Sequence, residues 1–287
     1  MLKLRPLTDI VGTEVSGLDL AQPLGAADFE TIRRAWLDST ILLFRGQSIT
    51  PVQQVAFTLL FGELVTYGRS EHALPGHPEV LVLSNMKRDD GEPMGAPVAG
   101  RYWHTDGHFL EQPPAASFLY AVEVPANGGD TLFANMYAAY EALPEATRRR
   151  INGRRVIISR VQSRPFNYPH KPQVTTEERA AWPDMPQPLV RTHPETGRPA
   201  LYVGGNVPWR IEGMPHSESD ILIPELQAFA TQSRFVYVHR WQAGDAILWD
   251  NRSAMHRATA YDLLNDKRLM HRTTVAGDLP FYRDPGT

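Results

Sequence analysis

The chain has 287 residues, of which 42% are hydrophobic and 21% charged, so it can bury a sizeable core and is too apolar for a disordered protein. Its 29 basic and 32 acidic side chains give a net charge of -3, which indicates no nucleic-acid or membrane-surface partner. The absence of cysteine excludes disulfides, thiolate metal sites and cysteine nucleophiles. Residues 1–7 are too short for a signal-peptide core, and no apolar run approaches about 18 residues, so we expect a cytoplasmic protein with no membrane segment.

The first part of the chain predicts two helices with a buried strand between them. Apolar residues recur at helical spacing over residues 29–36, and the apolar run 40–44 that follows is typical of a buried strand. Thr50 before Pro51 predicts an N-cap with proline in the first turn. The second helix is expected to continue to Gly62.

From residue 79 the pattern changes to short runs rich in β-forming residues. These runs are bounded by Gly, Pro and Asn and occupy residues 80–83, 117–122, 155–159, 201–203, 235–241, 246–249 and 269–275. Helices are expected at 136–150, with Asn135 as N-cap, and at 217–234, where Pro224 makes the start uncertain. Many short strands without alternating helices favour a sandwich or barrel over a parallel βαβ sheet.

Residues 163–199 hold eight prolines and have little periodicity. This composition predicts a long irregular segment between strands, and such segments are often lids or binding loops. The chain contains no internal repeat, low-complexity tract or clear linker. We therefore expect residues 1–287 to form a single domain with a lid-like insertion at about 163–199.

The most informative polar pattern lies in the segment Arg101–Phe109. In a strand, residues two apart project from the same face, so His104 and Asp106 could bind one ion. A His-x-Asp pair with a distant histidine is the ligand set of the 2-His-1-carboxylate iron site, which leaves positions open for co-substrate and oxygen. His108 would lie about 13 Å of backbone from His104, too far to share that ion. The third ligand should therefore come from elsewhere in the chain.

His256 is the best-placed late histidine. It follows the buried run 246–249, after a turn at Asp250 that would return the chain to the site. Farther on, Arg268 and Arg272 share one face of a predicted strand, where two guanidinium groups could each bind a carboxylate. A lone His-x-Asp pair is more often a surface pair than a metal site, and strand arginines are usually solvated or ion-paired. The joint occurrence of these groups on predicted β elements favours the iron site.

These motifs together resemble those of the TauD/TfdA family of Fe(II)- and 2-oxoglutarate-dependent dioxygenases. The resemblance covers nearly the whole chain and rests on residues 10–20 with 23–24, Trp103–Asp106, Gly128–Thr131, Trp249–Asn251 with Met255–His256, and Met270–Thr273. It implies a mostly β fold with flanking helices around a double-stranded β-helix, the cupin-like jelly roll. It also implies a homo-oligomer, either a dimer or a tetramer.

The resemblance assigns roles to individual residues. The implied iron ligands and catalytic residues are His104, Asp106 and His256. Thr131 would hydrogen-bond 2-oxoglutarate, Arg268 would bind its distal carboxylate, and Arg272 would bind an acidic group of the primary substrate. The implied reaction uses O2 and 2-oxoglutarate, oxidises a C–H bond of a small acidic substrate (a sulfonate, sulfate ester or carboxylate), and releases succinate and CO2. Asp106 argues for hydroxylation or a related oxidation, because halogenating relatives lack that carboxylate.

Departures from the family pattern concern the substrate. Tyr67 stands where the taurine-oxidising member has a sulfonate-binding histidine, and Gly100 stands where that member has asparagine, so taurine is not expected. Tyr67 and Tyr102 could contact the substrate, although aromatic residues also serve ordinary packing in a core or lid. The same alternatives hold for Phe109, Phe166 and Tyr168.

The spacing between the late ligand and the arginines is a further departure. The step from His256 to Arg268 is one residue longer than in the taurine enzyme, which predicts a bulge or longer turn between Ala260 and Asp266. Trp249 and Asp250 are expected to orient His256 rather than to bind a ligand.

Other functions stay open at this point. The same chemistry could end in desaturation, epimerisation or decarboxylation, and the same fold could be a non-catalytic iron-binding sensor. A sensor need not keep Thr131, Arg268 and Arg272, and all three are present. A zinc hydrolase is disfavoured because no general-base glutamate accompanies the predicted ligands.

Overall fold

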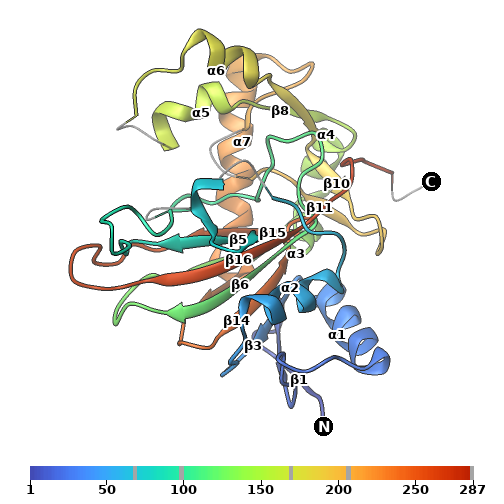
Figure 1. Cartoon of the computed structure of the whole chain (residues 1–287). Coiled ribbons are helices and arrows are strands. Elements are labelled where there is room, and N and C mark those ends of the chain that lie inside the picture. The colour runs from blue at the N-terminus through green and yellow to red at the C-terminus, as the bar shows by residue number, and fades with distance from the viewer. Residues whose placement is uncertain (67–69, 97–99, 168–170, 205–207, 285–287) are drawn as a thin grey trace.

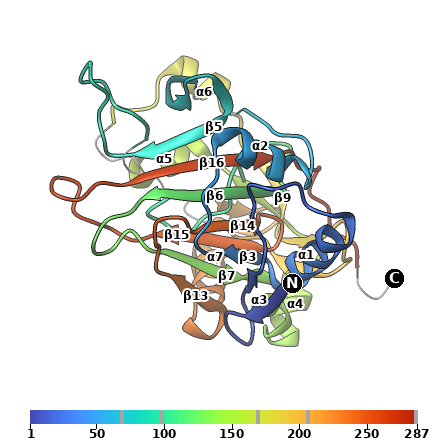
Figure 2. The same cartoon turned by 60° about the horizontal axis from the view of Figure 1, so that its bottom comes forward.

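A computed structural model describes residues 1–66, 70–96, 100–167, 171–204 and 208–284 (Figure 1). Its largest sheet has eight strands in the order β1 (Lys3–Pro6), β2 (Thr13–Ser16), β3 (Ile41–Phe44), β14 (Ala246–Asp250), β6 (Ala116–Glu123), β16 (Leu269–Val275), β5 (His77–Ser84) and β4 (Ala73–Leu74). Figure 2 shows β5, β16, β6 and β14 side by side in that order. Only the β2–β3 pair among these described strands is parallel.

A second sheet packs on one face of the large sheet. It contains β13 (Val236–His239), β7 (Thr131–Asn135) and β15 (Ala254–Ala258). Alternate residues of the central strands meet Phe133 of β7 in one buried cluster, among them Ile41, Leu43, Leu119, Ile247 and Trp249. The alternation of side chains along a strand produces this cluster on one face of the sheet. The strand-rich class expected from the sequence is confirmed, although β7 and β15 were not among the predicted strands.

Two helices cover the opposite face of the large sheet. Helix α1 (Ala26–Ser39) and helix α2 (Pro51–Leu59) pack on the intervening strand residues, which include Leu42, Phe44, Phe118 and Leu248. The Thr50 side chain accepts a hydrogen bond from the backbone N–H of Gln53, and a complete capping box forms. The predicted N-cap is therefore confirmed, whereas α2 ends three residues before Gly62.

Three further helices pack around a separate buried cluster. Asn135 caps α3 (Met136–Glu141) as predicted, but the single helix expected over 136–150 is divided because Pro144 is the N-cap of α4 (Glu145–Ile151). Helix α7 (His216–Ala230) continues through Pro224. Two short 3-10 segments are η1 (Ser70–His72) and η2 (Ser233–Phe235). None of the helices within the described residues combines the length and hydrophobicity needed to span a bilayer.

The expectation of an irregular segment over 163–199 is wrong for about half of that stretch. It contains α6 (Thr176–Ala181), β9 (Met185–Pro188) and β10 (Val190–Thr192), and α5 (Arg160–Asn167) overlaps its start. Two small sheets use these strands: β12 (Pro208–Ile211), β8 (Arg155–Ile158) and β9 form one, and β10 with β11 (Pro199–Leu201) forms the other.

Pro186 and Pro188 are tolerated in β9 because this strand lies at the edge of its sheet, where a missing N–H is not required.

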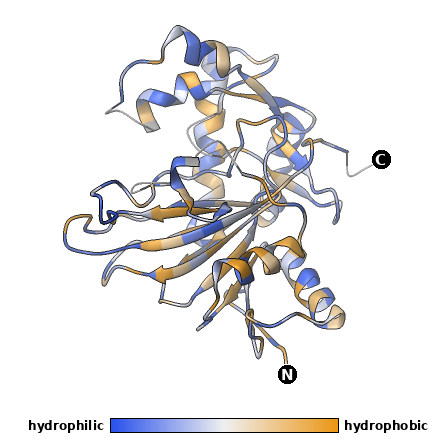
Figure 3. Cartoon of the chain, viewed as in Figure 1, coloured by the Kyte–Doolittle hydropathy of each residue, from blue (hydrophilic) through white to orange (hydrophobic). Residues whose placement is uncertain are grey.

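Figure 1 shows α5 and α6 together at the top of the molecule, on the far side of the large sheet from α1. In Figure 3, the strands of the large sheet carry much of the hydrophobic sequence, whereas the segment around α5 and α6 is largely hydrophilic.

Candidate metal and co-substrate site

Three predicted ligands converge beside the second sheet. His256 lies in β15, and an isolated antiparallel bridge holds His104 next to it, with backbone N···O distances of 2.9 Å and 2.8 Å in the two directions. The Asp106 Oδ1 atom lies 3.7 Å from His104 Nε2 and 4.0 Å from His256 Nε2. All three ligand atoms lie within 4.8 Å of one another. Ligand atoms this close together could bind a single metal ion.

The route to this convergence differs from the strand expected over Arg101–Phe109. His104 forms only a single bridge, and the chain turns directly after Asp106, with a 2.8 Å hydrogen bond from Leu110 N to Gly107 O. Gly107 has φ +61°, a conformation that favours glycine. The pairing of His104 with Asp106 is therefore found, but a bridge followed by a turn produces it, and the predicted same-face strand is wrong.

The turn also explains the position of His108. Its ring is buried at 1% exposure and packs edge-on against Tyr202, with 4.2 Å between ring centroids. Burial lowers the pKa of His108 to about 3, so the ring is neutral. His108 lies outside the cluster of three ligands, as predicted, because the turn carries it away and not because an extended strand separates it.

The two clustered histidines are held in the form that binds a metal. The Nδ1 atom of His104 lies 2.8 Å from the Tyr102 carbonyl oxygen, which can only accept, so Nδ1 carries the proton and Nε2 has a free lone pair. Burial lowers the pKa of His104, and burial together with the neighbouring His104 ring lowers the pKa of His256 to about 3. Both imidazoles are therefore neutral at physiological pH.

Asp106 provides the negative charge of the cluster. Burial opposes its ionisation, but the Arg272 guanidinium group and the hydrogen bond from Ser117 hold the pKa of its carboxyl well below the usual range. The Arg272 Nη1 atom lies 3.3 Å from Oδ1 and 3.4 Å from Oδ2, and the Ser117 hydroxyl donates to Oδ2 at 2.7 Å. Two neutral imidazoles and one carboxylate are a donor set that suits a non-haem iron ion. Ser117 was not predicted, and its only signal in the sequence is a hydroxyl within an apolar strand.

Thr131 and Arg268 are both close to the Gly128–Gly129 turn. A Cβ on Gly129 would lie 3.7 Å from Arg268 Nε, and Thr131, two residues after Gly129, is the first residue of β7. The Thr131 hydroxyl accepts a 2.9 Å hydrogen bond from Trp241 Nε1, a contact that the sequence did not predict. Because an indole N–H can only donate, the Thr131 hydroxyl keeps its own proton for another acceptor.

Arg268 and Arg272 have different surroundings. Burial lowers the pKa of Arg268, and among the described residues no carboxylate lies within ion-pair distance of its guanidinium group. Arg272, in contrast, already contacts Asp106. The turn expected between Ala260 and Asp266 is found, closed by a 3.1 Å hydrogen bond from Asp266 N to Asp262 O.

The predicted aromatic and orienting residues divide into several groups. The ring centroids of Tyr102 and His104 are 5.4 Å apart, and those of Trp249 and His256 are 4.7 Å apart, so both aromatic rings border the ligands. Tyr67 and Tyr168 lie outside the described residues. Asp250 was expected to orient His256, but its carboxylate instead binds Arg252 at 2.7 Å and His193 at 3.0 Å. Its role in the described structure is in that buried ion pair.

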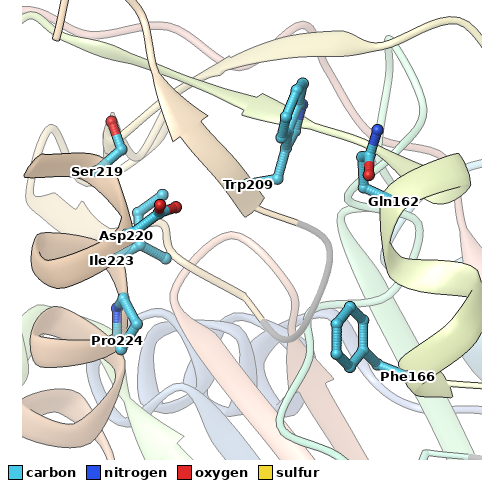
Figure 4. Close-up of a pocket in the computed structure, with 7 residues that line it drawn as sticks. All are labelled: Gln162, Phe166, Trp209, Ser219, Asp220, Ile223 and Pro224. Carbon is cyan, nitrogen blue, oxygen red and sulfur yellow. The ribbon is translucent and has the colours of Figure 1, made fainter. Parts of the chain in front are cut away.

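Two other aromatic candidates contact or belong to helix α5. Phe109 packs under the guanidinium group of Arg160, 4.4 Å from its ring centroid, and Trp182 lies 4.1 Å from the same group. Phe166 is 76% exposed and borders a separate cavity between α5, β12 and α7. Figure 4 shows that cavity, whose described lining is Gln162, Phe166, Trp209, Ser219, Asp220, Ile223 and Pro224. The cavity lining contains none of the three clustered ligands.

Comparison with known proteins gives a consistent result. The family model described as taurine catabolism dioxygenase TauD, TfdA family matches residues 3–274. The alpha-ketoglutarate-dependent 2,4-dichlorophenoxyacetate dioxygenase of Cupriavidus pinatubonensis is 34% identical over 279 residues, which cover 94% of this chain and 96% of the relative. An alpha-ketoglutarate-dependent sulfate ester dioxygenase of Pseudomonas putida is 32% identical over 97% of this chain and 91% of its own. The crystal structure of AAD-2 in complex with Mn(II) and N-oxalylglycine superimposes with a TM-score of 0.83 at 34% identity, covering 98% of this chain and 99% of that one.

Proposed function

The chain belongs to the TauD/TfdA family of dioxygenases, and from this premise we propose that it is an Fe(II)-dependent enzyme that oxidises a C–H bond of a small organic acid. As a member of this family it is an oxidoreductase that uses 2-oxoglutarate as co-substrate. In the proposed reaction, one oxygen atom of O2 enters succinate, CO2 is released, and the other oxygen atom enters the substrate. The observation that carries the proposal is the convergence of two neutral imidazoles and one carboxylate within 4.8 Å.

The residues that would hold the metal are His104, Asp106 and His256. Bound iron supplies the activation of O2 and the oxidation of the substrate. The protein holds each ligand atom beforehand: the bridge to β15 places His104, the Tyr102 carbonyl fixes its tautomer, and Ser117 holds the carboxylate. Three protein ligands leave the remaining positions for co-substrate and O2.

Arg268 and Thr131 would bind the distal carboxylate of 2-oxoglutarate. A guanidinium group withdrawn from water is unfavourable without an anionic partner, and the described residues provide no carboxylate for Arg268. A carboxylate ligand would satisfy the two donors together, because the Thr131 hydroxyl still has its proton to donate. This argument supports Arg268, rather than Arg272, as the co-substrate arginine.

Arg272 would bind the acidic group of the primary substrate. Its Nη1 atom contacts Asp106, but its buried Nε atom has no hydrogen-bond partner among the described residues. We propose aryloxyalkanoic acids and alkyl sulfate esters as the substrate classes, in agreement with the two relatives described above. We do not propose taurine as a substrate, because Gly100 has no side chain that could bind it. A Cβ at this position would overlap with the His104 ring.

Several wider features are part of the proposal. The large sheet and the β13-β7-β15 sheet would be the two walls of a double-stranded β-helix, with residues 1–287 as one domain. We propose that the protein acts in the cytoplasm as a homo-oligomer, a dimer or a tetramer. Tyr67 and Tyr102 would border the substrate, and α5 and α6 would form a lid.

The proposal is tested by measuring succinate after incubation with Fe(II), ascorbate, O2 and 2-oxoglutarate. The test acids are phenoxyacetate and an alkyl sulfate, and the matched control is phenoxyacetamide, which has the same ring and ether but no charge. We expect an acid to stimulate succinate formation and the amide to leave it at background. Equal stimulation by acid and amide would refute the acid-binding role, and no succinate from iron-loaded protein would refute the catalytic proposal in favour of an iron-binding sensor.

A further inference from the structure

A continuous series of hydrogen bonds ends on the metal-site carboxylate. The indole Nε1 of Trp249 donates to Asn251 Oδ1 at 2.8 Å, and Asn251 Nδ2 donates to Ser117 Oγ at 3.1 Å. The Ser117 hydroxyl then donates to Asp106 Oδ2 at 2.7 Å. Ser117 lies in β6, Asn251 directly follows the neighbouring strand β14, and all three donor residues are at most 1% exposed.

The direction of every bond in this series is fixed by its two ends. An indole N–H can only donate, and an ionised carboxylate can only accept. Asn251 must therefore present its oxygen to Trp249 and its amide N–H to Ser117, which leaves the Ser117 proton for Asp106. Aligned hydrogen bonds in a buried environment polarise and strengthen one another. The Ser117 hydroxyl is therefore a strong hydrogen-bond donor directed at one oxygen of the carboxylate, Asp106 Oδ2.

The two oxygens of Asp106 are in different positions as a result. Oδ2 receives the Ser117 proton, whereas Oδ1 is the atom that lies 3.7 Å and 4.0 Å from the two histidine Nε2 atoms. We infer that Ser117 is a positioning residue, supported by Asn251 and Trp249, that keeps Asp106 a one-oxygen ligand through Oδ1. This inference rests on the proposed function, because it requires that the cluster binds a metal.

Arg272 makes this restraint necessary. Its Nη1 atom lies almost equally close to both carboxylate oxygens, at 3.3 Å and 3.4 Å, so it does not select between them. A carboxylate held only by Arg272 could rotate and present both oxygens to the metal. Two-oxygen binding would fill a position that the co-substrate or O2 requires. The Ser117 hydroxyl removes that option by keeping Oδ2 engaged.

The test compares Ser117→Ala with Ser84→Ala, a matched loss of one buried hydroxyl from the same sheet. Ser84 lies in β5 at 2% exposure, and its Oγ accepts a hydrogen bond from Met86 N rather than from the metal site. Mn(II) binding to the purified full chain is measured by titration calorimetry. Without Ser117 the Asp106 carboxylate is no longer held in its binding orientation before the metal arrives, so we expect Ser117→Ala to raise the Mn(II) dissociation constant about 10-fold and Ser84→Ala to leave it unchanged. Ser117→Cys, with a weak donor of similar size, should fall between wild type and Ser117→Ala.

A second comparison tests the series as a unit. Asn251→Ala should weaken Mn(II) binding less than Ser117→Ala, and adding it to Ser117→Ala should weaken binding no further, because without the serine Asn251 cannot act on Asp106. Equal Mn(II) affinity of wild type and Ser117→Ala would overturn the inference, as would strictly additive effects in the double variant. Absence of Mn(II) binding by the wild-type protein would instead refute the proposed metal site itself, so the two failures are distinguishable.

Discussion

Gly100 controls the space behind the ring of His104, and replacing it gives a sharp test of the site geometry. Its φ is +66°, and a Cβ built there would lie 2.7 Å from His104 Cε1 and 3.3 Å from Nε2. Contacts below 3.0 Å are not sustained, so the ring must move. Gly100 cannot easily withdraw, because its carbonyl accepts a 2.7 Å hydrogen bond from Ala258 N at the end of β15.

The Gly100→Ala change has two separable effects. A non-glycine residue at this φ costs about 1–2 kcal/mol in folding free energy, which lowers Tm by several degrees. The displaced His104 ring then misplaces a ligand atom, and metal sites require ligand positions correct to about 0.5 Å. We expect the Mn(II) dissociation constant to rise about 10-fold or more.

Gly197→Ala is the matched control for backbone strain. Gly197 has φ +70°, and nothing lies within 4 Å of the position of its Cβ. Both variants should therefore lose a similar few degrees of Tm by differential scanning calorimetry, while only Gly100→Ala loses Mn(II) affinity by titration calorimetry. If Gly100→Ala bound Mn(II) as tightly as wild type, the assignment of His104 Nε2 as a metal ligand would be wrong.

Three further variants test other parts of the account. Trp241→Phe removes the donor to Thr131 and should raise the 2-oxoglutarate dissociation constant of the Mn(II)-loaded protein about 3- to 10-fold, since a hydrogen bond contributes about 0.5–1.5 kcal/mol; unchanged binding would exclude this role. Arg268→Ala should raise KM for 2-oxoglutarate more than KM for the acid, and Arg272→Ala the reverse; the opposite pattern would exchange the two roles. Burial opposes the charge of Asp250, but the adjacent arginine holds its pKa below the usual range, so its stabilisation is complete above about pH 5 and is lost as pH falls further. The Tm difference between wild type and Asp250→Asn should accordingly be constant from pH 8 to 5 and narrow in more acidic buffer, and a pH-independent difference would contradict the ion-pair explanation.

The sequence predicted the central strands of the large sheet because they are rich in β-forming residues. The run 246–249 and the run 269–275 correspond closely to β14 and β16. The strands β7 and β15 escaped prediction because they are short and carry polar residues such as Thr131 and His256, which belong to the site. Local propensity is weakest where a strand serves function as well as packing.

The identities of the three clustered residues were predictable, whereas their geometry was not. The spacing of His104 and Asp106 suggested a strand face, but the turn at Gly107 depends on a glycine conformation and on a bridge to β15, a long-range contact. Ser117 and Trp241 act through hydrogen bonds to residues in other elements, 11 and 110 positions away in the sequence, and single-sequence patterns carry no record of such partners.

The most direct test of the central claim is to locate the metal in crystals of the protein grown with Mn(II), by anomalous scattering. The account predicts one strong peak about 2.0–2.3 Å from His104 Nε2, His256 Nε2 and Asp106 Oδ1, with Oδ2 still bound to Ser117. A peak elsewhere, or protein that remains metal-free at saturating Mn(II), would contradict the assignment of this cluster as the catalytic metal site.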